Sequence, residues 1–166
     1  MKIRYIVCGI IQNGTKIVLG KKAKGEFPYP DVWHTAGGGA EDIKLAKRLY
    51  EVGDYDNKYF HSELRRELKE ELNIEVTNIK CIVPQYRSQV RQDKTENKKR
   101  VMTHYYFLEY LCDYAGGELR PGDDLAEAEW FEKSKLVLVR LTPPSKDLYR
   151  ELGWIKGKCL LESLIF

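Results

Sequence analysis

The stretch "HSELRRELKEELNIEV", residues 61 to 76, decides how the rest of the chain is interpreted. It is expected to place four glutamates, Glu63, Glu67, Glu70 and Glu71, on one short helix, and the last three crowd a single turn. At about 100 degrees per residue, the four fall within about one third of the helix circumference. Like charges at i,i+4 destabilise a helix by roughly 0.2 to 0.5 kcal/mol per pair, so the cluster calls for a reason.

The helix that carries these glutamates is expected from about Tyr59 to Leu72. Its apolar residues repeat every four positions: Phe60, Leu64, Leu68 and Leu72. Asn73 follows, and asparagine tolerates the left-handed conformation that ends many helices. One side of the helix is therefore predicted to pack in the core, and the neighbouring side to be acidic.

A divalent cation would remove the repulsion. Mg²⁺ takes oxygen ligands, keeps several waters and uses one or two protein carboxylates together with substrate phosphates. The alternative is a solvated face neutralised by Arg65, Arg66 and Lys69, and the helix alone does not choose between the two. Upstream, "AGGGAE" at 36–41 is either a plain turn or a glycine loop whose backbone approaches a phosphate or lends a carbonyl to the metal.

Composition predicts one domain, residues 1–166, because a chain of this length supports a single ordinary core. The formal charge of +3 is mild and argues for neither nucleic acid nor membrane. The apolar run at 6–11 is too short for a signal peptide or a membrane span, which predicts a soluble, cytoplasmic protein. The cysteines are scattered, which disfavours a zinc site and indicates reduced thiols: Cys8, Cys81, Cys112 and Cys159.

The first half of the chain is expected to begin with two antiparallel strands, residues 3–11 and 17–20, joined by a tight turn at Asn13-Gly14. Residues 24–33 are expected to form a loop that ends in a short extended piece near Trp33. Three consecutive glycines are taken to exclude a regular element after it, and a short helix is predicted at 42–52.

The second half is predicted to hold one or two strands within 74–90, a polar loop at 91–100 and a long strand at 101–114. Residues 126–136 are expected to lead into a short helix. A last helix is predicted to start near the prolines after Thr142 and to stop at Gly153.

Two parts of the sequence together resemble the signature of the Nudix hydrolase (MutT-like) family, written Gx5Ex7REUxEExGU with U an aliphatic residue. The first part supplies Gly37, Gly38, Gly39 and Glu41. The second, "RELKEELNI" at 66–74, matches at Arg66, Glu67, Leu68, Glu70, Glu71 and Ile74, with Asn73 in place of glycine. The opening hairpin, "DVWHTAGGGAE", "DDLAEAEWF" and "LTPPSKDLYRELGWI" are also similar to family members. The resemblance implies a Nudix-type α/β/α sandwich with a mixed central sheet.

The chain departs from the signature between its two parts. The glycine and the glutamate expected 14 and 8 residues before the arginine are Val52 and Lys58, so 14 extra residues separate Gly38 from the helix. The first glutamate of the signature is either lost or represented by Glu41, and Ala36 replaces the family's proline.

The resemblance implies hydrolysis of a nucleoside diphosphate linked to a group X, with Mg²⁺ or Mn²⁺ as cofactor. It implies Glu67, Glu70 and Glu71 as metal ligands and Gly37, Gly38 and Gly39 as backbone contacts. Arg66 is expected to orient Glu70 or Glu63. In the family the general base is a glutamate of the box, which here means Glu67 or Glu70, or one from a later loop. The candidate here is Glu127 in "DDLAEAEWF", with Asp124 as its substitute, and the alternative for both is an ordinary solvated loop.

Substrate choice is weakly encoded. Four residues of the expected sheet either stack on a base or contact phosphate, or else belong to the core: Tyr86, Arg87, Tyr105 and Phe107. Structural or surface roles are expected for His34, His61 and His104. The expected partner is a small-molecule nucleotide, with nucleic acid and membrane disfavoured and a homodimer an option. Two rivals stay open: a nucleotide-sensing or partner-binding Nudix domain without catalysis, and an RNA-directed protein that uses the basic residues of 91–100.

Overall fold

A computed structural model of the chain describes residues 1–24, 29, 31–82, 88–94, 100–122 and 125–156. Along the chain its elements are β1 (Lys2–Asn13), β2 (Lys16–Lys22), β3 (Trp33–His34), β4 (Ala36–Gly39), α1 (Ile43–Glu51), α2 (Lys58–Leu72), β5 (Ile74–Cys81), β6 (Ser88–Lys94), β7 (Arg100–Gly117), β8 (Leu125–Glu132), the 3₁₀ helix η1 (Lys133–Leu138) and α3 (Pro143–Glu151).

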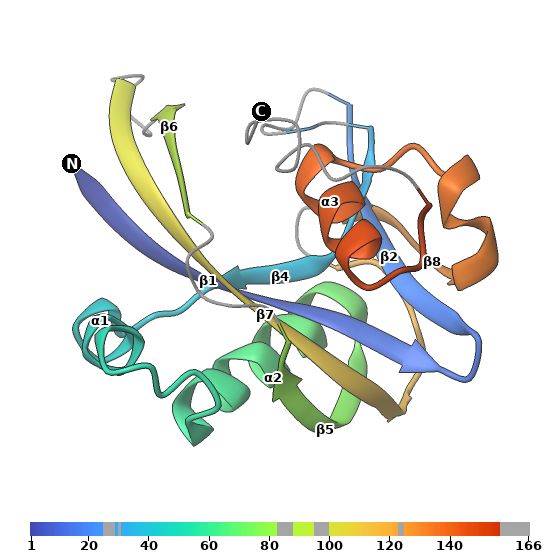
Figure 1. Cartoon of the computed structure of the whole chain (residues 1–166), viewed down its shortest axis with the longest axis horizontal. Coiled ribbons are helices and arrows are strands. Elements are labelled where there is room, and N and C mark those ends of the chain that lie inside the picture. Colours follow the sequence, from blue (N-terminus) through green and yellow to red (C-terminus); the bar gives the residue numbers. More distant parts are fainter. Residues whose placement is uncertain (25–28, 30, 83–87, 95–99, 123–124, 157–166) are drawn as a thin grey trace.

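The strands form one mixed sheet (Figure 1). Strands β3, β2, β1, β7 and β5 are neighbours in that order, while β8 lies beside β2, β4 beside β1 and β6 beside β7. The long strands β1 and β7 run parallel, and the other pairs are antiparallel. Strand β1 pairs with β4 through residues 6–9 and with β2 through residues 12 and 13. Because β1 pairs with β2 near its end, residues 6–9 of β1 can pair with β4, which lies beside α2.

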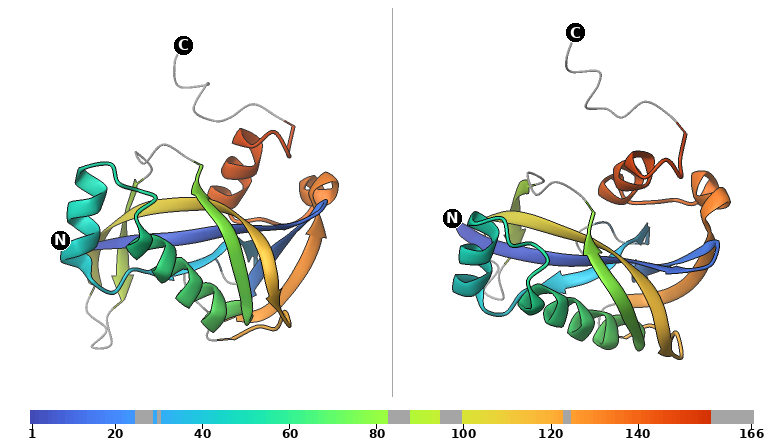
Figure 2. Two further views of the ribbon diagram at one scale, coloured as in Figure 1. Left: turned by 90° about the horizontal axis from the view of Figure 1, so that it is seen from below. Right: turned by 60° about the horizontal axis from the view of Figure 1, so that its bottom comes forward.

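Helices cover both faces of the sheet (Figure 2). On one face, α2 contributes its predicted apolar stripe, fully buried: Phe60, Leu64, Leu68 and Leu72. On the other face, Leu148 and Tyr149 of α3 form a second core. Successive residues of a strand point to opposite faces, so Ile10 of β1 joins the α3 core while Ile11 joins the α2 core. The predicted α/β sandwich with a mixed central sheet is confirmed.

Several local predictions are confirmed as well. The opening hairpin has Gly14 at φ 60°, in the left-handed region that the tight turn requires. Asn73 ends α2 with φ 56° and ψ 32°, and its N–H donates to the Lys69 carbonyl. Pro143 begins α3, whose cap Thr142 accepts a hydrogen bond from the Ser145 N–H.

The expectation for the three glycines was wrong. They belong to β4, an antiparallel neighbour of β1 with Gly38 opposite Val7. Glycine usually weakens a strand because it has no side chain to pack. Here it is required because the backbones of β4 and β1 approach each other closely. A Cβ on Gly37 would lie 2.1 Å from the Val7 carbonyl oxygen, so only a residue without a side chain fits beside β1 at this position.

Two boundaries in the second half also differ from expectation. The polar loop predicted at 91–100 is shorter, because β6 extends to Lys94 and β7 begins at Arg100, paired with each other. Strand β8 precedes the expected short helix η1 and pairs with β2, a long-range partner that local pattern does not reveal. Residues Tyr86, Arg87 and Asp124 lie outside the described residues. Within the described part, none of the helices has the length and apolar character that crossing a membrane demands.

Candidate active site between α2 and β4

Three glutamates one helical turn apart, Glu63, Glu67 and Glu71, form a line on α2 that we call the acidic stripe. Their relative exposures are only 8%, 9% and 7%. The alternative of a solvated acidic face is therefore wrong for these three residues. Glu70 lies on the outer side, with 46% of its side chain exposed. Burying three carboxylates is unfavourable unless each finds donors or cations, so their surroundings identify their role.

The acidic stripe lies against the glycine strand. The Gly37 N–H donates to Glu71 Oε2 at 3.1 Å. A Cβ on Gly38 would lie 2.1 Å from Glu67 Oε2, so the Glu67 carboxylate occupies the space where another residue would have its side chain. The triple glycine therefore allows two close contacts, with β1 at Gly37 and with the acidic stripe at Gly38.

Arg66 supplies positive charge to the same group. Its Nη2 donates to Glu67 Oε1 at 2.9 Å, to Glu63 Oε2 at 3.2 Å and to the Gly39 carbonyl at 3.2 Å. Its Nη1 donates to Glu70 at 3.2 Å. The hydrogen bond with Glu63 raises the pKa of Arg66, which therefore stays charged. The expected orientation of Glu70 and Glu63 by Arg66 agrees with these contacts, although its catalytic role stays a prediction.

The negative charge of Glu67 is not fully stabilised by its surroundings, even though Arg66 is adjacent. Burial raises the pKa of Glu67 above its usual value, and the adjacent Arg66 only partly opposes that rise. A carboxylate whose charge is incompletely compensated gains from a further cation.

The donors present suit Mg²⁺ or Mn²⁺. In the described ranges, no group of three or more His, Cys, Asp or Glu side chains is gathered so that it could hold a metal by itself. Mg²⁺ needs only one or two protein carboxylates beside water and phosphate oxygens, however. Glu67 and Glu71 offer two buried carboxylates on the wall of one cavity, so hard oxygen donors of the required kind are in place.

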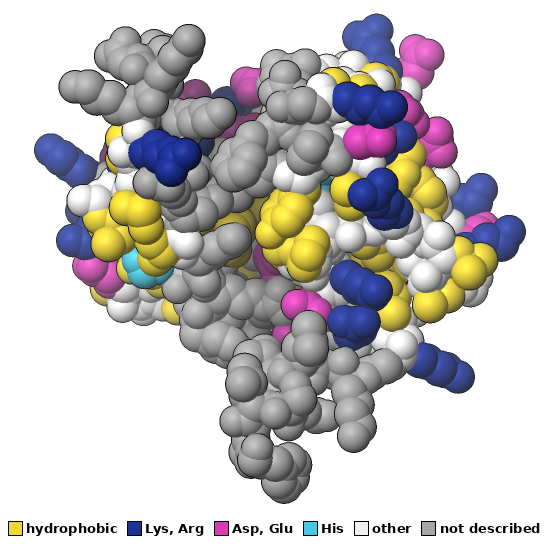
Figure 3. All heavy atoms as spheres, turned by 90° about the horizontal axis from the view of Figure 1, so that it is seen from above, with side chains coloured by type: hydrophobic (Ala, Val, Ile, Leu, Met, Phe, Trp, Pro, Cys, Tyr) yellow, Lys and Arg dark blue, Asp and Glu magenta, His cyan; other side chains and the backbone are white. Residues whose placement is uncertain are grey.

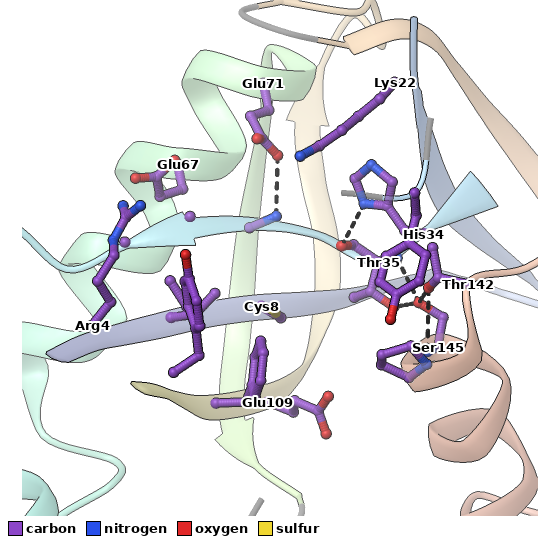
Figure 4. Close-up of a pocket in the computed structure, with 18 residues that line it drawn as sticks. Arg4, Cys8, Lys22, His34, Thr35, Glu67, Glu71, Glu109, Thr142 and Ser145 are labelled. Atoms are coloured by element: carbon purple, nitrogen blue, oxygen red, sulfur yellow. Dashed lines mark hydrogen bonds between the residues drawn. The ribbon is translucent and has the colours of Figure 1, made fainter. Parts of the chain in front are cut away.

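That cavity has a volume of about 380 Å³ and is lined by Glu67 and Glu71 of the acidic stripe and by residues of β1 and β7. Figure 4 shows Arg4 and Glu67 at one end, Thr35, Thr142 and Ser145 at the other, and Lys22 pointing toward Glu71. On its sheet side, the rings of Tyr105 and Phe107 stack with centroids 6.3 Å apart and planes at 19°. An apolar ring surface and anionic metal donors thus share one space.

The cavity also contains Cys8 and Glu109, which sequence reasoning missed as site residues. They are register partners on the parallel strands β1 and β7, and Glu109 is 7% exposed. Burial, and then the charge of Glu109, raises the pKa of Cys8 well above its usual value, so the thiol stays protonated and is no nucleophile. Glu109 could have been found from the sequence, because alternate residues of a strand share a face and positions 105, 107 and 109 therefore lie together.

The end of the cavity near α3 is held by hydroxyl groups. Thr35 Oγ1 lies 2.7 Å from the Tyr149 hydroxyl, and the Thr35 N–H donates to Ser145 Oγ at 3.1 Å. Thr142 donates to the same Ser145 oxygen at 2.9 Å. These contacts fix the start of α3 against the segment that leads into β4.

The remaining predicted site residues lie elsewhere. Glu127 is on β8, where it forms an ion pair with Lys21 at 2.8 Å and is half exposed. His61 contacts Asp56 at 3.0 Å, and His104 stacks on Tyr106. Of the three histidines, only His34 lines the cavity. Tyr105 and Phe107 are cavity residues.

Comparison with known proteins gives the same picture over the whole fold. The model of the NUDIX domain matches residues 2–152. The nucleoside triphosphatase NudI of Escherichia coli strain UMN026 is 24% identical over 153 residues, covering 92% of this chain and 99% of the relative. NudI of Shigella sonnei strain Ss046 is similar to the same extent.

Solved structures agree in fold. A MutT NUDIX hydrolase from Burkholderia pseudomallei has a TM-score of 0.61 at 18% identity, covering 92% of this chain and 99% of that one. The E. coli ORF135 protein has a TM-score of 0.55 at 22% identity, with 92% of each chain covered. The NUDIX domain of Shewanella oneidensis NrtR, solved with ADP ribose, has a TM-score of 0.57 at 10% identity and covers 92% and 86%. The chain belongs to the NUDIX family, as its signature residues predicted, and is a Nudix pyrophosphohydrolase.

Proposed function

We propose that this protein uses Mg²⁺ or Mn²⁺ to hydrolyse a diphosphate bond in a small nucleotide, with nucleoside triphosphates the first candidates. One observation carries the proposal: a single cavity brings together two buried carboxylates of α2, the bare backbone of β4 and a stacked aromatic pair. The relatives named nucleoside triphosphatase cover nearly the same length of chain and support the choice of substrate.

Charge divides the cavity into a phosphate end and a base end. Glu67 and Glu71 would hold the cation, which would neutralise phosphate oxygens and make a bound water more acidic. Arg4 and Lys22 are cationic lining residues and attract the phosphate chain. Phe107, with Tyr105 beside it, offers a ring surface on which a base stacks.

Hydrolysis transfers a water oxygen to phosphorus while the P–O bond of the anhydride breaks. The departing phosphate takes the electron pair, and the proton of the water passes to a carboxylate. Glu67 is favoured as that acceptor because it lines the cavity and lies against the bare backbone of β4. Glu70 points outward and Glu127 is paired with Lys21, so each is a weaker candidate. Arg66 acts by holding Glu67 in place.

A substrate screen tests the function. Purified protein with Mg²⁺ is incubated with nucleoside triphosphates, nucleotide sugars, dinucleoside polyphosphates and dinucleotide cofactors, and products are separated by chromatography. We expect a nucleoside monophosphate and a phosphorylated second product, and loss of turnover on addition of a chelator or in Glu71→Gln. Absence of turnover with every substrate contradicts the proposal.

The same preparation separates the two rivals. Nucleotide binding by calorimetry without turnover favours a sensing domain. For an RNA-directed protein, low-salt RNA affinity is required. Lys98 and Lys99 lie outside the described residues, and on the face seen in Figure 3 the described Lys and Arg side chains are interspersed with acidic ones rather than joined in one basic patch. This mixture supports a small-molecule substrate.

A further inference from the structure

The split in the signature leaves a structural question about α2. Lys58 stands where the signature has its first glutamate, and it is the exposed first residue of the helix. Eight residues of α-helix separate it from Arg66, a rise of about 12 Å. Lys58 therefore lies more than two helical turns from the carboxylates around Arg66, and a glutamate at position 58 would be equally remote.

Glu63 connects the end of β4 to Arg66 on α2. Its Oε2 accepts a hydrogen bond from the Glu41 N–H at 2.7 Å, just beyond the end of β4. The same carboxylate accepts from Arg66 Nε at 3.4 Å and from Nη2 at 3.2 Å. A buried carboxylate with three such donors is held in one orientation. Glu63 thus joins the backbone of Glu41, two residues beyond Gly39, to the guanidinium that holds Glu67.

The segment 42–57, which contains the 14 extra residues, starts and ends beside the first turn of α2. The Asp42 N–H donates to the Tyr59 hydroxyl at 2.9 Å, and the Asn57 side chain caps α2 by accepting from the Tyr59 N–H. Both ends of the insertion are thus tied to the first turn of α2, one turn before Glu63. The insertion can lengthen the chain without moving β4 away from the acidic stripe, since Glu41 stays bound to α2.

Glu63 also sets how Arg66 is shared. Arg66 Nη2 contacts Glu63, Glu67 and the Gly39 carbonyl together. The carboxylate of Glu63 compensates part of the positive charge of Arg66, so that Glu67 does not have to do so alone. Without Glu63, the guanidinium is left with Glu67 at 2.9 Å, Glu70 at 3.2 Å and the exposed Glu41 at 3.7 Å, so its closest carboxylate is Glu67 and it competes with a cation for that residue.

We propose that Glu63 takes the place of the signature glutamate that position 58 has lost, as the positioning residue that ties β4 to α2 and keeps Arg66 from neutralising Glu67, so that Glu67 and Glu71 bind a divalent cation. The inference rests on the proposed function for its catalytic meaning, while its test by metal binding does not need turnover.

The experiment compares Mn²⁺ binding, followed by electron paramagnetic resonance of the free ion, in wild-type protein and Glu63→Gln. Glutamine keeps the shape and one acceptor oxygen but removes the charge. We expect Mn²⁺ affinity to fall about tenfold to a hundredfold, as when partners of metal ligands are changed in other sites. The Mg²⁺ concentration for half-maximal hydrolysis should rise in parallel, with the nucleotide KM at saturating Mg²⁺ within about twofold.

Glu75→Gln is the matched control, because Glu75 is an exposed glutamate just beyond α2 that forms an ion pair with Lys69 and does not line the cavity. It should bind Mn²⁺ like the wild type. A Glu63→Gln protein that melts at a lower temperature but binds Mn²⁺ with unchanged affinity shows a merely structural role and overturns the inference. So does wild-type protein that binds no Mn²⁺.

Lys58→Glu keeps the proposal testable even where Glu63→Gln does not fold, since position 58 is exposed. Restoring the signature glutamate there should leave Mn²⁺ affinity within about twofold, because it lies about 12 Å along the helix from Arg66. An affinity that rises about tenfold overturns the inference. If no nucleotide is hydrolysed although Glu63→Gln weakens Mn²⁺ binding, the proposed function fails and the role of Glu63 stands.

Discussion

Two sides of helix α2 contact the same sheet in opposite ways. On one side, leucines such as Leu64 and Leu68 pack on β1, where a Cβ added to Gly9 would meet Leu68 at 3.0 Å. On the other side, Glu67 and Glu71 contact the backbone of β4. The apolar side gains free energy from burial alone, whereas the acidic side needs Arg66 and backbone donors. The first side therefore supports the fold, whereas the second is the side to which we assign metal binding.

Removing a leucine tests the apolar side and has the largest expected effect. Leu68→Ala should lower the free energy of unfolding by about 2–5 kcal/mol, since the side chain is fully buried. Urea denaturation followed by circular dichroism measures the loss. Turnover per folded molecule should change little, and a large fall in kcat at unchanged Mg²⁺ dependence would contradict the separation of the two sides.

Adding a methyl group to the acidic side should have the reverse outcome. In Gly38→Ala the Cβ would lie 2.1 Å from Glu67 Oε2, the far end of a flexible side chain that can move. We expect activity to fall about a hundredfold, because reacting groups displaced by about 1 Å lose that much, with little change in melting temperature.

Gly37→Ala provides the contrast to Gly38→Ala. Its Cβ meets the Val7 carbonyl oxygen, which belongs to the sheet backbone and cannot move cheaply. This variant should be destabilised. Equal stability loss in both glycine variants would show that the Glu67 carboxylate is not the group displaced.

The base end of the cavity should respond through binding. Phe107→Ala removes a stacking surface worth roughly 1–3 kcal/mol per base in other nucleotide sites, so KM should rise about tenfold or more with kcat less affected. Phe107→Tyr keeps the ring and should retain most of the affinity. An unchanged KM in the alanine variant would place the base elsewhere.

The raised pKa of Glu67 predicts how stability depends on pH without metal. The folded protein holds this proton more tightly than the unfolded chain, so the contribution is complete below the unfolded pKa and is lost as pH rises through the folded pKa. In thermal melting experiments with a chelator, the contribution of Glu67 to stability should fall as pH rises. The melting temperature of Glu67→Gln should fall less over the same pH range. Mg²⁺ should reduce the difference between the two proteins, and identical profiles in chelator would argue against a strained carboxylate.

Glu127→Gln should have the smallest effect. Its ion pair with Lys21 is partly exposed, and such pairs contribute little because solvent screens them. Activity should stay within about twofold. A fall of a hundredfold or more, with the acid limb of the pH–rate profile altered, would identify Glu127 as the general base instead of Glu67.

Local rules recovered the parts of this fold that local forces decide. The leucine repeat gave α2, Asn73 gave its end, and Asn13-Gly14 gave the hairpin. They failed at the triple glycine, because the close approach of Val7 and Glu67 is a long-range property. For the same reason, sequence could not tell that Glu67 is buried and Glu127 paired on β8. Periodicity predicts which residues share a face, but not which other element covers that face.

We propose that Glu67 and Glu71 are buried because together they bind a divalent cation. Crystals grown with Mn²⁺ and a non-hydrolysable nucleotide, measured at the manganese absorption edge, test it most directly. We expect an anomalous peak within coordination distance of both carboxylates and of the nucleotide phosphates. A nucleotide bound in the cavity with no peak beside these carboxylates, or with Arg66 alone neutralising Glu67, would contradict it.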